Sequence, residues 1–140
     1  MIKTLQLLEE KNTYLEKFVG LNAEEMKRIS KDDFSNLEDF REARENILNI
    51  VKHIDGMIQE RMGLMDPYLV PIEMKREIQN LMDKKDEFVH TILAQDLEIM
   101  EVIENEKSKI IVDLQAVRKV KKNIGSYKSY NPKDTIDEDV

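Results

Sequence analysis

The sequence contains no cysteine and no tryptophan, and it holds only four glycines and three prolines among 140 residues. The absence of cysteine excludes a disulfide framework, a thiolate metal site and a cysteine nucleophile. The scarcity of glycine and proline leaves too few turn residues for an all-β sandwich or barrel. Hydrophobic residues make up 41% and charged residues 36% of the chain. This composition predicts one domain with a core of its own and a heavily charged surface.

The charge balance and the lack of long hydrophobic runs limit the classes of partner. Lys and Arg number 22 against 29 Asp and Glu, which gives a formal net charge of −7 and argues against nucleic acid as the main ligand. No stretch approaches the ~20 apolar residues of a membrane span, and the first residues lack a signal-peptide pattern. We therefore expect a cytoplasmic protein without a membrane partner.

Motifs that carry chemistry are nearly absent. The sequence has no glycine-rich phosphate loop and no nucleophile elbow. One pair, Glu87 and His90, has the Glu-x-x-His spacing of a helical metal site, but di-iron bundles need two such motifs and two further glutamates. The only other histidine, His53, has Ile50 three residues before it, so the second motif is missing. We expect no metal, no cofactor, no catalytic residue and no enzymatic activity.

The apolar periodicity predicts helices over the first half of the chain. Over residues 3–29 a seam recurs at alternating steps of three and four residues, as in a coiled coil. Its members are Leu5, Leu8, Asn12, Leu15, Val19, Asn22, Met26 and Ile29. A second helix is expected over residues 31–62, opened by a capping box between Ser30 and Asp33. So short a connection makes the two helices antiparallel neighbours.

Residues 63–72 contain one glycine and two prolines, which end the second helix. The apolar residues of this loop are Leu64, Met65, Leu69 and Val70. We expect such a loop to pack over the end of the bundle rather than to extend into water.

A long third helix is expected over residues 73–124, because this stretch contains no glycine or proline and keeps helical spacing. Gly125 is expected to end the helix, and the polar residues 126–140 are expected to form a disordered tail. The predicted fold is therefore all-α, an antiparallel helical hairpin plus one long third helix. It forms a three- to four-helix bundle with coiled-coil-like packing, in a single domain over residues 1–125.

The predicted helix lengths do not match, and this mismatch points to a binding surface. Each hairpin helix is about 40 Å long, whereas the third would span about 78 Å if unbroken. The uncovered half, about residues 96–124, keeps an apolar stripe that needs a partner, since isolated helices gain their stability from packing. The candidate partner-binding residues are Ile99, Ile103, Ile110, Leu114 and Val117, with Asp96 and Glu101 from a neighbouring acidic block.

Three arrangements would cover this stripe. The chain could break near residues 94–95 and fold back as a fourth helix, two copies could pair, or another protein's helix could dock. Residues 96–106 carry acids without any Lys or Arg, whereas residues 107–122 carry six basic residues against only Asp113. Antiparallel pairing centred near Lys109 would set each acidic block beside the other's basic end. A homodimer through residues 96–124 is thus one hypothesis, and simple solvation of these charges is the alternative.

Three stretches resemble flagellar export chaperones of the FliT/FlgN kind. Residues 31–48 combine a small acidic turn, the aromatic Phe34, a leucine and a helix containing Arg-Glu. Residues 92–100 place an aspartate among apolar residues of the long helix, and residues 114–127 end a Lys-rich segment in Gly and Tyr. Some relatives break the last region into a separate helix, and nothing in this sequence forces that break.

The resemblance implies a small, acidic, cytoplasmic helical protein without cofactor or catalysis. Such chaperones hold a late-exported flagellar subunit, such as the filament cap or a hook–filament junction protein, and prevent its premature assembly. They then deliver it to the export ATPase complex and gate. Recognition would be of the helix-in-groove type, here on the candidate residues of the third helix. Two alternatives remain open, namely a dimeric coiled-coil scaffold without a client and a helical sensor of a small ligand.

Overall fold

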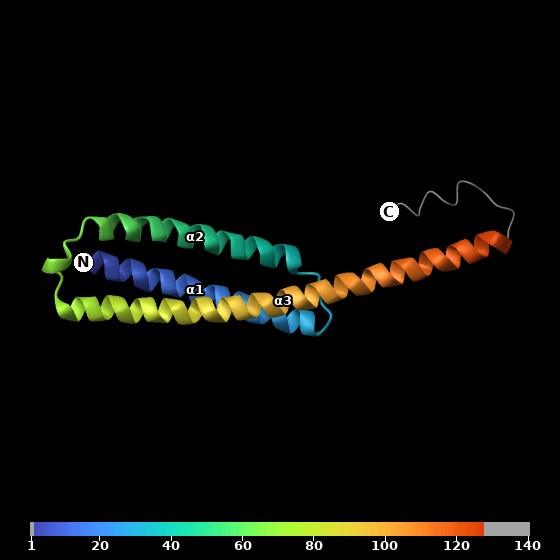
Figure 1. The fold of residues 1–140 in the computed structure, drawn as a ribbon, viewed down its shortest axis with the longest axis horizontal. Coiled ribbons are helices and arrows are strands. Elements are labelled where there is room, and N and C mark those ends of the chain that lie inside the picture. The colour runs from blue at the N-terminus through green and yellow to red at the C-terminus, as the bar shows by residue number, and fades with distance from the viewer. Residues whose placement is uncertain (1, 128–140) are drawn as a thin grey trace. The chain divides into compact units, whose positions relative to one another are not determined.

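The computed structural model describes residues 2–127, which form three α-helices and one short 3-10 turn but no strand (Figure 1). Helix α1 spans Ile2–Ser30, α2 spans Leu37–Gly63, η1 spans Pro67–Leu69 and α3 spans Ile72–Tyr127. The helices pack against one another, so the predicted all-α bundle is confirmed. The chain divides into two compact units, Met1–Ile99 and Met100–Val140. A single domain over residues 1–125 stays a prediction, and most of the predicted tail lies outside the described residues.

Hydrogen bonds and ion pairs fix the direction of α1 and α2 within the first unit. Lys11 Nζ of α1 lies 2.6 Å from Asp55 Oδ1 of α2. Near the turn between them, Asn36 Nδ2 donates to Glu25 Oε2 at 3.1 Å. The contact made further along α1, at Glu25, is thus to a residue that comes earlier in the chain than Asp55. The two helices are therefore antiparallel, as the sequence predicts.

Helix α3 runs in the same direction as α1, and two asparagines of the predicted seam connect them. Asn12 Nδ2 donates to the carbonyl oxygen of Leu81 at 3.0 Å, and Asn22 Nδ2 donates to Gln95 Oε1 at 3.1 Å. Both asparagines are buried. They therefore fix the register of α3 against α1 at two points along the unit.

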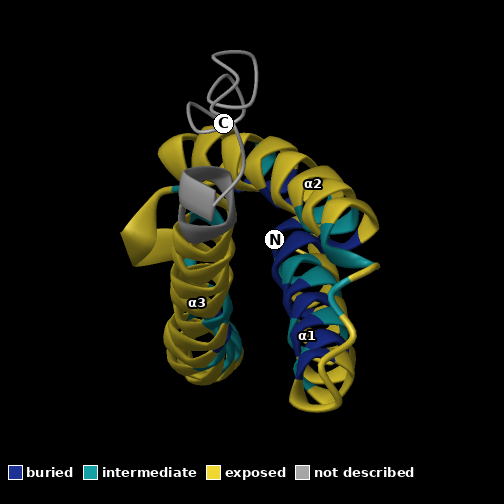
Figure 2. Ribbon diagram, turned by 90° about the vertical axis from the view of Figure 1, so that its right-hand side faces the viewer, coloured by how far each residue is buried: buried dark blue, intermediate teal, exposed yellow. Residues whose placement is uncertain are grey.

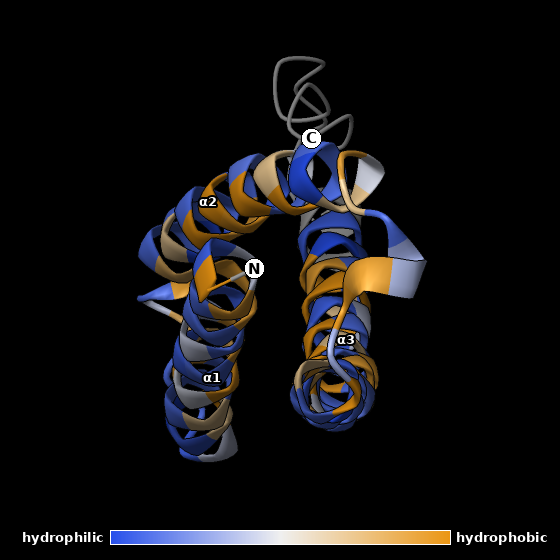
Figure 3. Cartoon of the chain, turned by 90° about the vertical axis from the view of Figure 1, so that its left-hand side faces the viewer, coloured by the Kyte–Doolittle hydropathy of each residue, from blue (hydrophilic) through white to orange (hydrophobic). Residues whose placement is uncertain are grey.

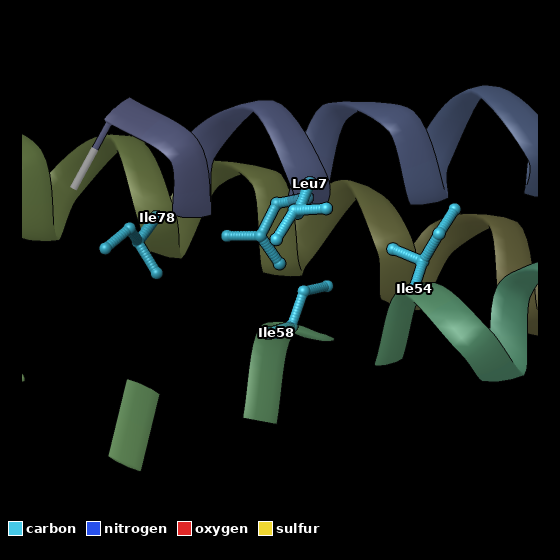
Figure 4. Close-up of a cluster of buried hydrophobic side chains, with 5 residues drawn as sticks. Leu7, Ile54, Ile58 and Ile78 are labelled. Carbon is cyan, nitrogen blue, oxygen red and sulfur yellow. The ribbon is translucent and has the colours of Figure 1, made fainter. Parts of the chain in front are cut away.

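The centre of the first unit is a cluster of aliphatic side chains from all three helices. Figure 4 shows Leu7 of α1, Ile54 and Ile58 of α2 and Ile78 of α3 gathered together, and Leu8 completes the cluster. Most buried residues belong to α1, whereas α3 is largely exposed (Figure 2). Burial of these side chains stabilises the unit, together with six further buried apolar residues outside the cluster.

The turn between α1 and α2 is longer than the sequence predicts, because the expected capping box does not form. Ser30 Oγ donates back to the carbonyl of Lys27 at 2.7 Å, and Asp32 adopts a left-handed φ of 59°, which ends α1. The Asp33 carboxylate instead accepts from Ser35 N and Ser35 Oγ, and these hydrogen bonds lower the pKa of Asp33. Helix α2 consequently begins at Leu37 rather than at residue 31.

The loop between α2 and α3 packs over the bundle only in part, through Met65, which contacts the core cluster. Leu64 and Leu69 are 83% and 79% exposed, while Met65 and Val70 are half-buried. Figure 3 shows hydrophobic residues on this turn. Asp66 caps η1 by accepting a hydrogen bond from Tyr68 N. The chain therefore reverses with Leu64 and Leu69 left in solvent.

Helix α3 is continuous, which excludes one of the three arrangements considered for the third helix. It runs without interruption through residues 94–95 and continues past Gly125 to Tyr127. The chain therefore does not break there to supply a fourth helix. A glycine within a helix costs only about 1 kcal/mol relative to alanine, so Gly125 does not force the helix to end.

Candidate partner-binding surface

The seven predicted partner-binding residues divide between two environments. Ile99 is only 3% exposed and belongs to the interior of the first unit. Asp96 also belongs to this unit, where it pairs with a side chain of α2. The remaining five lie in the C-terminal part of α3, from Met100 onward. The structure therefore does not bring the predicted set together as one free surface.

The C-terminal part of α3 carries the exposed portion of the predicted stripe. Ile110, Leu114 and Val117 are each about half exposed, at 52%, 49% and 52%. Ile103 is half-buried and Glu101 is exposed. The spacings of seven, four and three residues from Ile103 to Val117 place the four apolar side chains on one face of the helix. We call these four residues the α3 stripe.

The apolar surface of this segment is wider than the α3 stripe. Five further apolar side chains of the segment are exposed, and these are Met100, Val102, Ile111, Val112 and Val120. They lie outside the predicted stripe. Three consecutive apolar residues at 110–112 indicate a helix that is apolar on more than one face. The segment can thus contact a partner across a broad angle.

The Asp96 side chain contacts residues of both other helices. Its Oδ1 lies 2.9 Å from Arg44 Nη2 of α2 and accepts from Asn22 Nδ2 of α1 at 3.3 Å. Gln95 Nε2 donates to the carbonyl oxygen of Val19 at 3.2 Å. These four side chains, Asn22, Arg44, Gln95 and Asp96, connect all three helices, and we call them the polar clasp.

Two aromatic rings hold the guanidinium of the clasp in place. Arg44 Cζ lies 4.8 Å from the ring centroid of Phe18 and 5.0 Å from that of Phe40. Cation–π contacts of this kind stabilise a partly desolvated arginine. Both phenylalanines are buried, so the arginine is positioned by the core and in turn positions Asp96.

The pKa shifts of the described residues arise in exposed pairs, and Glu25, the buried acid among these residues, accepts a hydrogen bond from Asn36. A hydrogen bond from Arg41 lowers the pKa of Glu38, and one from Lys85 lowers the pKa of Asp86. Glu87 and His90 are both exposed. Within residues 2–127 no three His, Asp or Glu side chains gather as metal ligands would. No helix in this range has the length and apolarity needed to cross a membrane.

Comparisons with known proteins do not assign the chain to a family. No protein-family model, curated protein or solved structure matches the chain.

Proposed function

We propose that this chain is a cytoplasmic flagellar export chaperone of the FliT/FlgN kind, which binds a helical segment of a late-exported subunit on the C-terminal part of α3. The observation that carries the proposal is the exposed α3 stripe, together with the further apolar residues beside it. The resemblance of residues 31–48, 92–100 and 114–127 to these chaperones supplies the class of client, a filament cap or hook–filament junction subunit. Delivery to the export ATPase complex or gate belongs to the same proposal.

Exposed apolar side chains on a helix gain free energy when a partner removes them from water. Fully burying a Val, Leu or Ile side chain contributes about 1.5–3 kcal/mol, so half-exposed residues retain about half of that gain for a partner. An amphipathic client helix laid along α3 would bury several of them at once, in the helix-in-groove mode. Self-assembling flagellar subunits expose such helices before assembly, and covering them would delay polymerisation.

Replacing Leu114 and Val117 together by aspartate is expected to weaken client binding about a hundredfold or more, since two carboxylates would have to be desolvated in the interface. Both side chains are half exposed, so the first unit should fold normally. The measurement is isothermal titration calorimetry of the full chain with the purified cap and junction subunits of the same organism. Gln115→Asp, which adds a carboxylate at an exposed position between them, is the matched control and should bind normally.

Two outcomes would contradict the chaperone proposal. Binding of neither subunit by the unaltered chain would remove the proposed clients. Unchanged affinity of the Leu114→Asp, Val117→Asp variant, with circular dichroism equal to that of the unaltered chain, would remove the α3 stripe as the site.

A second candidate function, a dimeric coiled-coil scaffold, is favoured by the charge pattern along the same segment. Asp96 already pairs with Arg44, which leaves Glu98, Glu101, Glu104 and Glu106 as the acidic block. Antiparallel pairing of two copies near Lys109 would place Glu98 and Glu101 of one copy beside the basic residues 118–121 of the other. Such pairing would cover the α3 stripe without any client.

The scaffold predicts a dimer that weakens with salt, because ions screen exposed charges beyond about 10 Å at 0.1 M. Sedimentation velocity of the dilute chain should show a dimer at about 0.05 M salt and a larger monomer fraction at about 0.5 M. Glu101→Lys, which opposes the pairing, should shift the equilibrium further toward monomer. A monomer at low salt would exclude the scaffold.

A further inference from the structure

The turn between α2 and α3 presents large apolar side chains to solvent. Tyr68 is 95% exposed, Leu64 83%, Leu69 79% and Ile72 71%. We call these four residues the apolar tip. They lie within nine consecutive positions around η1, inside the first unit and on residues that the proposed client surface does not use. Single exposed apolar residues are common on protein surfaces, but four together indicate an interaction site.

A pocket adjoins the apolar tip. It has a volume of about 220 Å³, and its lining residues are Met62, Met65, Pro67, Val70, Lys75 and Ile78. All but Lys75 are apolar, and methionines in particular adapt their shape to a bound side chain. The same end of the unit therefore offers both protruding side chains and an apolar pocket to receive one.

Several backbone N–H groups of the tip already have hydrogen-bond acceptors within the chain. Leu64 N and Met65 N donate to the carbonyl oxygens of Arg61 and Met62, each at 3.2 Å. Tyr68 N donates to Asp66 Oδ1 at 3.0 Å. Leu69 N also donates to the carbonyl oxygen of Asp66 at 3.0 Å, and prolines have no N–H to satisfy. Since unpaired backbone groups make burial costly, this internal pairing lowers the cost of docking the tip.

The charges around the tip are balanced. Residues 60–76 hold three acids, Glu60, Asp66 and Glu73, and three bases, Arg61, Lys75 and Arg76. The chain as a whole has a net charge of −7, so this stretch is more neutral than the average of the sequence. A neutral patch of mixed sign can match its own rotated image, as a two-fold interface requires.

We propose that the apolar tip is a self-association surface, on which a second copy docks by two-fold symmetry. Tyr68 and Leu69 of each copy enter the pocket of the other, and the mixed charges pair around them. The stretch around the tip has no excess of basic residues to attract an anionic bilayer, which favours a protein partner. The patch is smaller than the 20–30 residues a side of a standard interface, so the dimer forms at high concentration and dissociates on dilution.

Sedimentation equilibrium of the full-length Leu114→Asp, Val117→Asp variant tests this proposal without interference from pairing through α3. We expect a dimer fraction that rises with concentration and persists at high salt, because apolar contacts are not screened by ions. Adding Tyr68→Asp or Leu69→Asp should raise the dissociation constant at least about tenfold, as loss of a large buried side chain requires. Leu48→Asp, the same change at a half-exposed position of α2, is the matched control and should leave the constant unchanged.

Concentration-dependent amide shifts, measured by nuclear magnetic resonance on the same variant, locate the contact. Shifts confined to residues 60–78 support the tip. A monomer at millimolar concentration, or shifts centred elsewhere, would overturn the proposal. So would a chain that stays monomeric but binds phosphatidylcholine–phosphatidylglycerol vesicles through Tyr68, since the occupant would then be a bilayer. None of these results depends on client binding, so failure here leaves the chaperone proposal standing.

Discussion

Replacing Leu7 by alanine is expected to lower the free energy of unfolding by about 2–5 kcal/mol, the usual range for a fully buried leucine. Leu7 is only 1% exposed and packs in the cluster that joins all three helices. The substitution removes apolar contacts and leaves a cavity that rigid helices cannot close. Since domains of this size are stable by only about 5–15 kcal/mol, the loss is a large fraction of the total. Urea unfolding followed by far-ultraviolet circular dichroism measures it.

Leu48→Ala provides the matched control for this experiment, because it makes the same chemical change at a half-exposed position of α2. Substitutions at such positions usually change stability by no more than about 0.5 kcal/mol. Equal losses for the two variants would show that the cluster around Leu7 is not the core of the unit.

The helices were predictable because their signals are local and repeated. The seam of α1 placed Asn12 and Asn22 among apolar residues, and the structure buries both and uses them to hold α3. The predicted limits of residues 3–29 differ from those of α1 by one residue at each end. A long run without glycine or proline likewise predicted a long third helix, and α3 spans Ile72–Tyr127.

The connections were less predictable, because they depend on contacts that no short pattern specifies. Ser30 and Asp33 fit a capping box in the sequence, but Ser35 competes for the Asp33 carboxylate and delays α2 to Leu37. The apolar loop after α2 resembled a cover for the core. Met65 of this loop does pack against the core cluster, whereas Leu64 and Leu69 remain exposed.

Two of the predicted partner-binding residues, Asp96 and Ile99, lie in the part of α3 that packs on the hairpin, and helix length explains why. Helix α2 contains 27 residues, and the first 27 residues of α3 end at Glu98. The next residue, Ile99, is the last buried residue of α3 among those described. The hairpin therefore covers α3 through Ile99. An apolar stripe continues through this point without any change of pattern, so the sequence alone does not mark where intramolecular packing stops.

The charge pattern also fails to mark where intramolecular packing stops. In the sequence, Asp96 belongs to a block of acids that is expected to be solvated, whereas in the structure it pairs with Arg44. Its replacement by alanine is expected to lower the free energy of unfolding by about 1–3 kcal/mol, because Arg44 and Asn22 would lose an acceptor in a partly desolvated site. The side chains of Arg44 and Asp96 are 24% and 35% exposed. Solvent screens the pair to that extent, so the loss stays below the 3–5 kcal/mol typical of a fully buried ion pair.

A double-mutant cycle separates the ion pair from the other contacts of the clasp. Arg44→Met keeps an apolar side chain between the two phenylalanine rings and removes the charge. If Asp96 acts through Arg44, the double variant should be destabilised by less than the sum of the single variants. Glu98→Ala, an exposed acid two residues away, should change stability by no more than about 0.5 kcal/mol. Additive losses, or an Asp96→Ala variant as stable as Glu98→Ala, would contradict this role in the fold. Asp96 would then belong with the exposed acids of α3, as a candidate partner-binding residue.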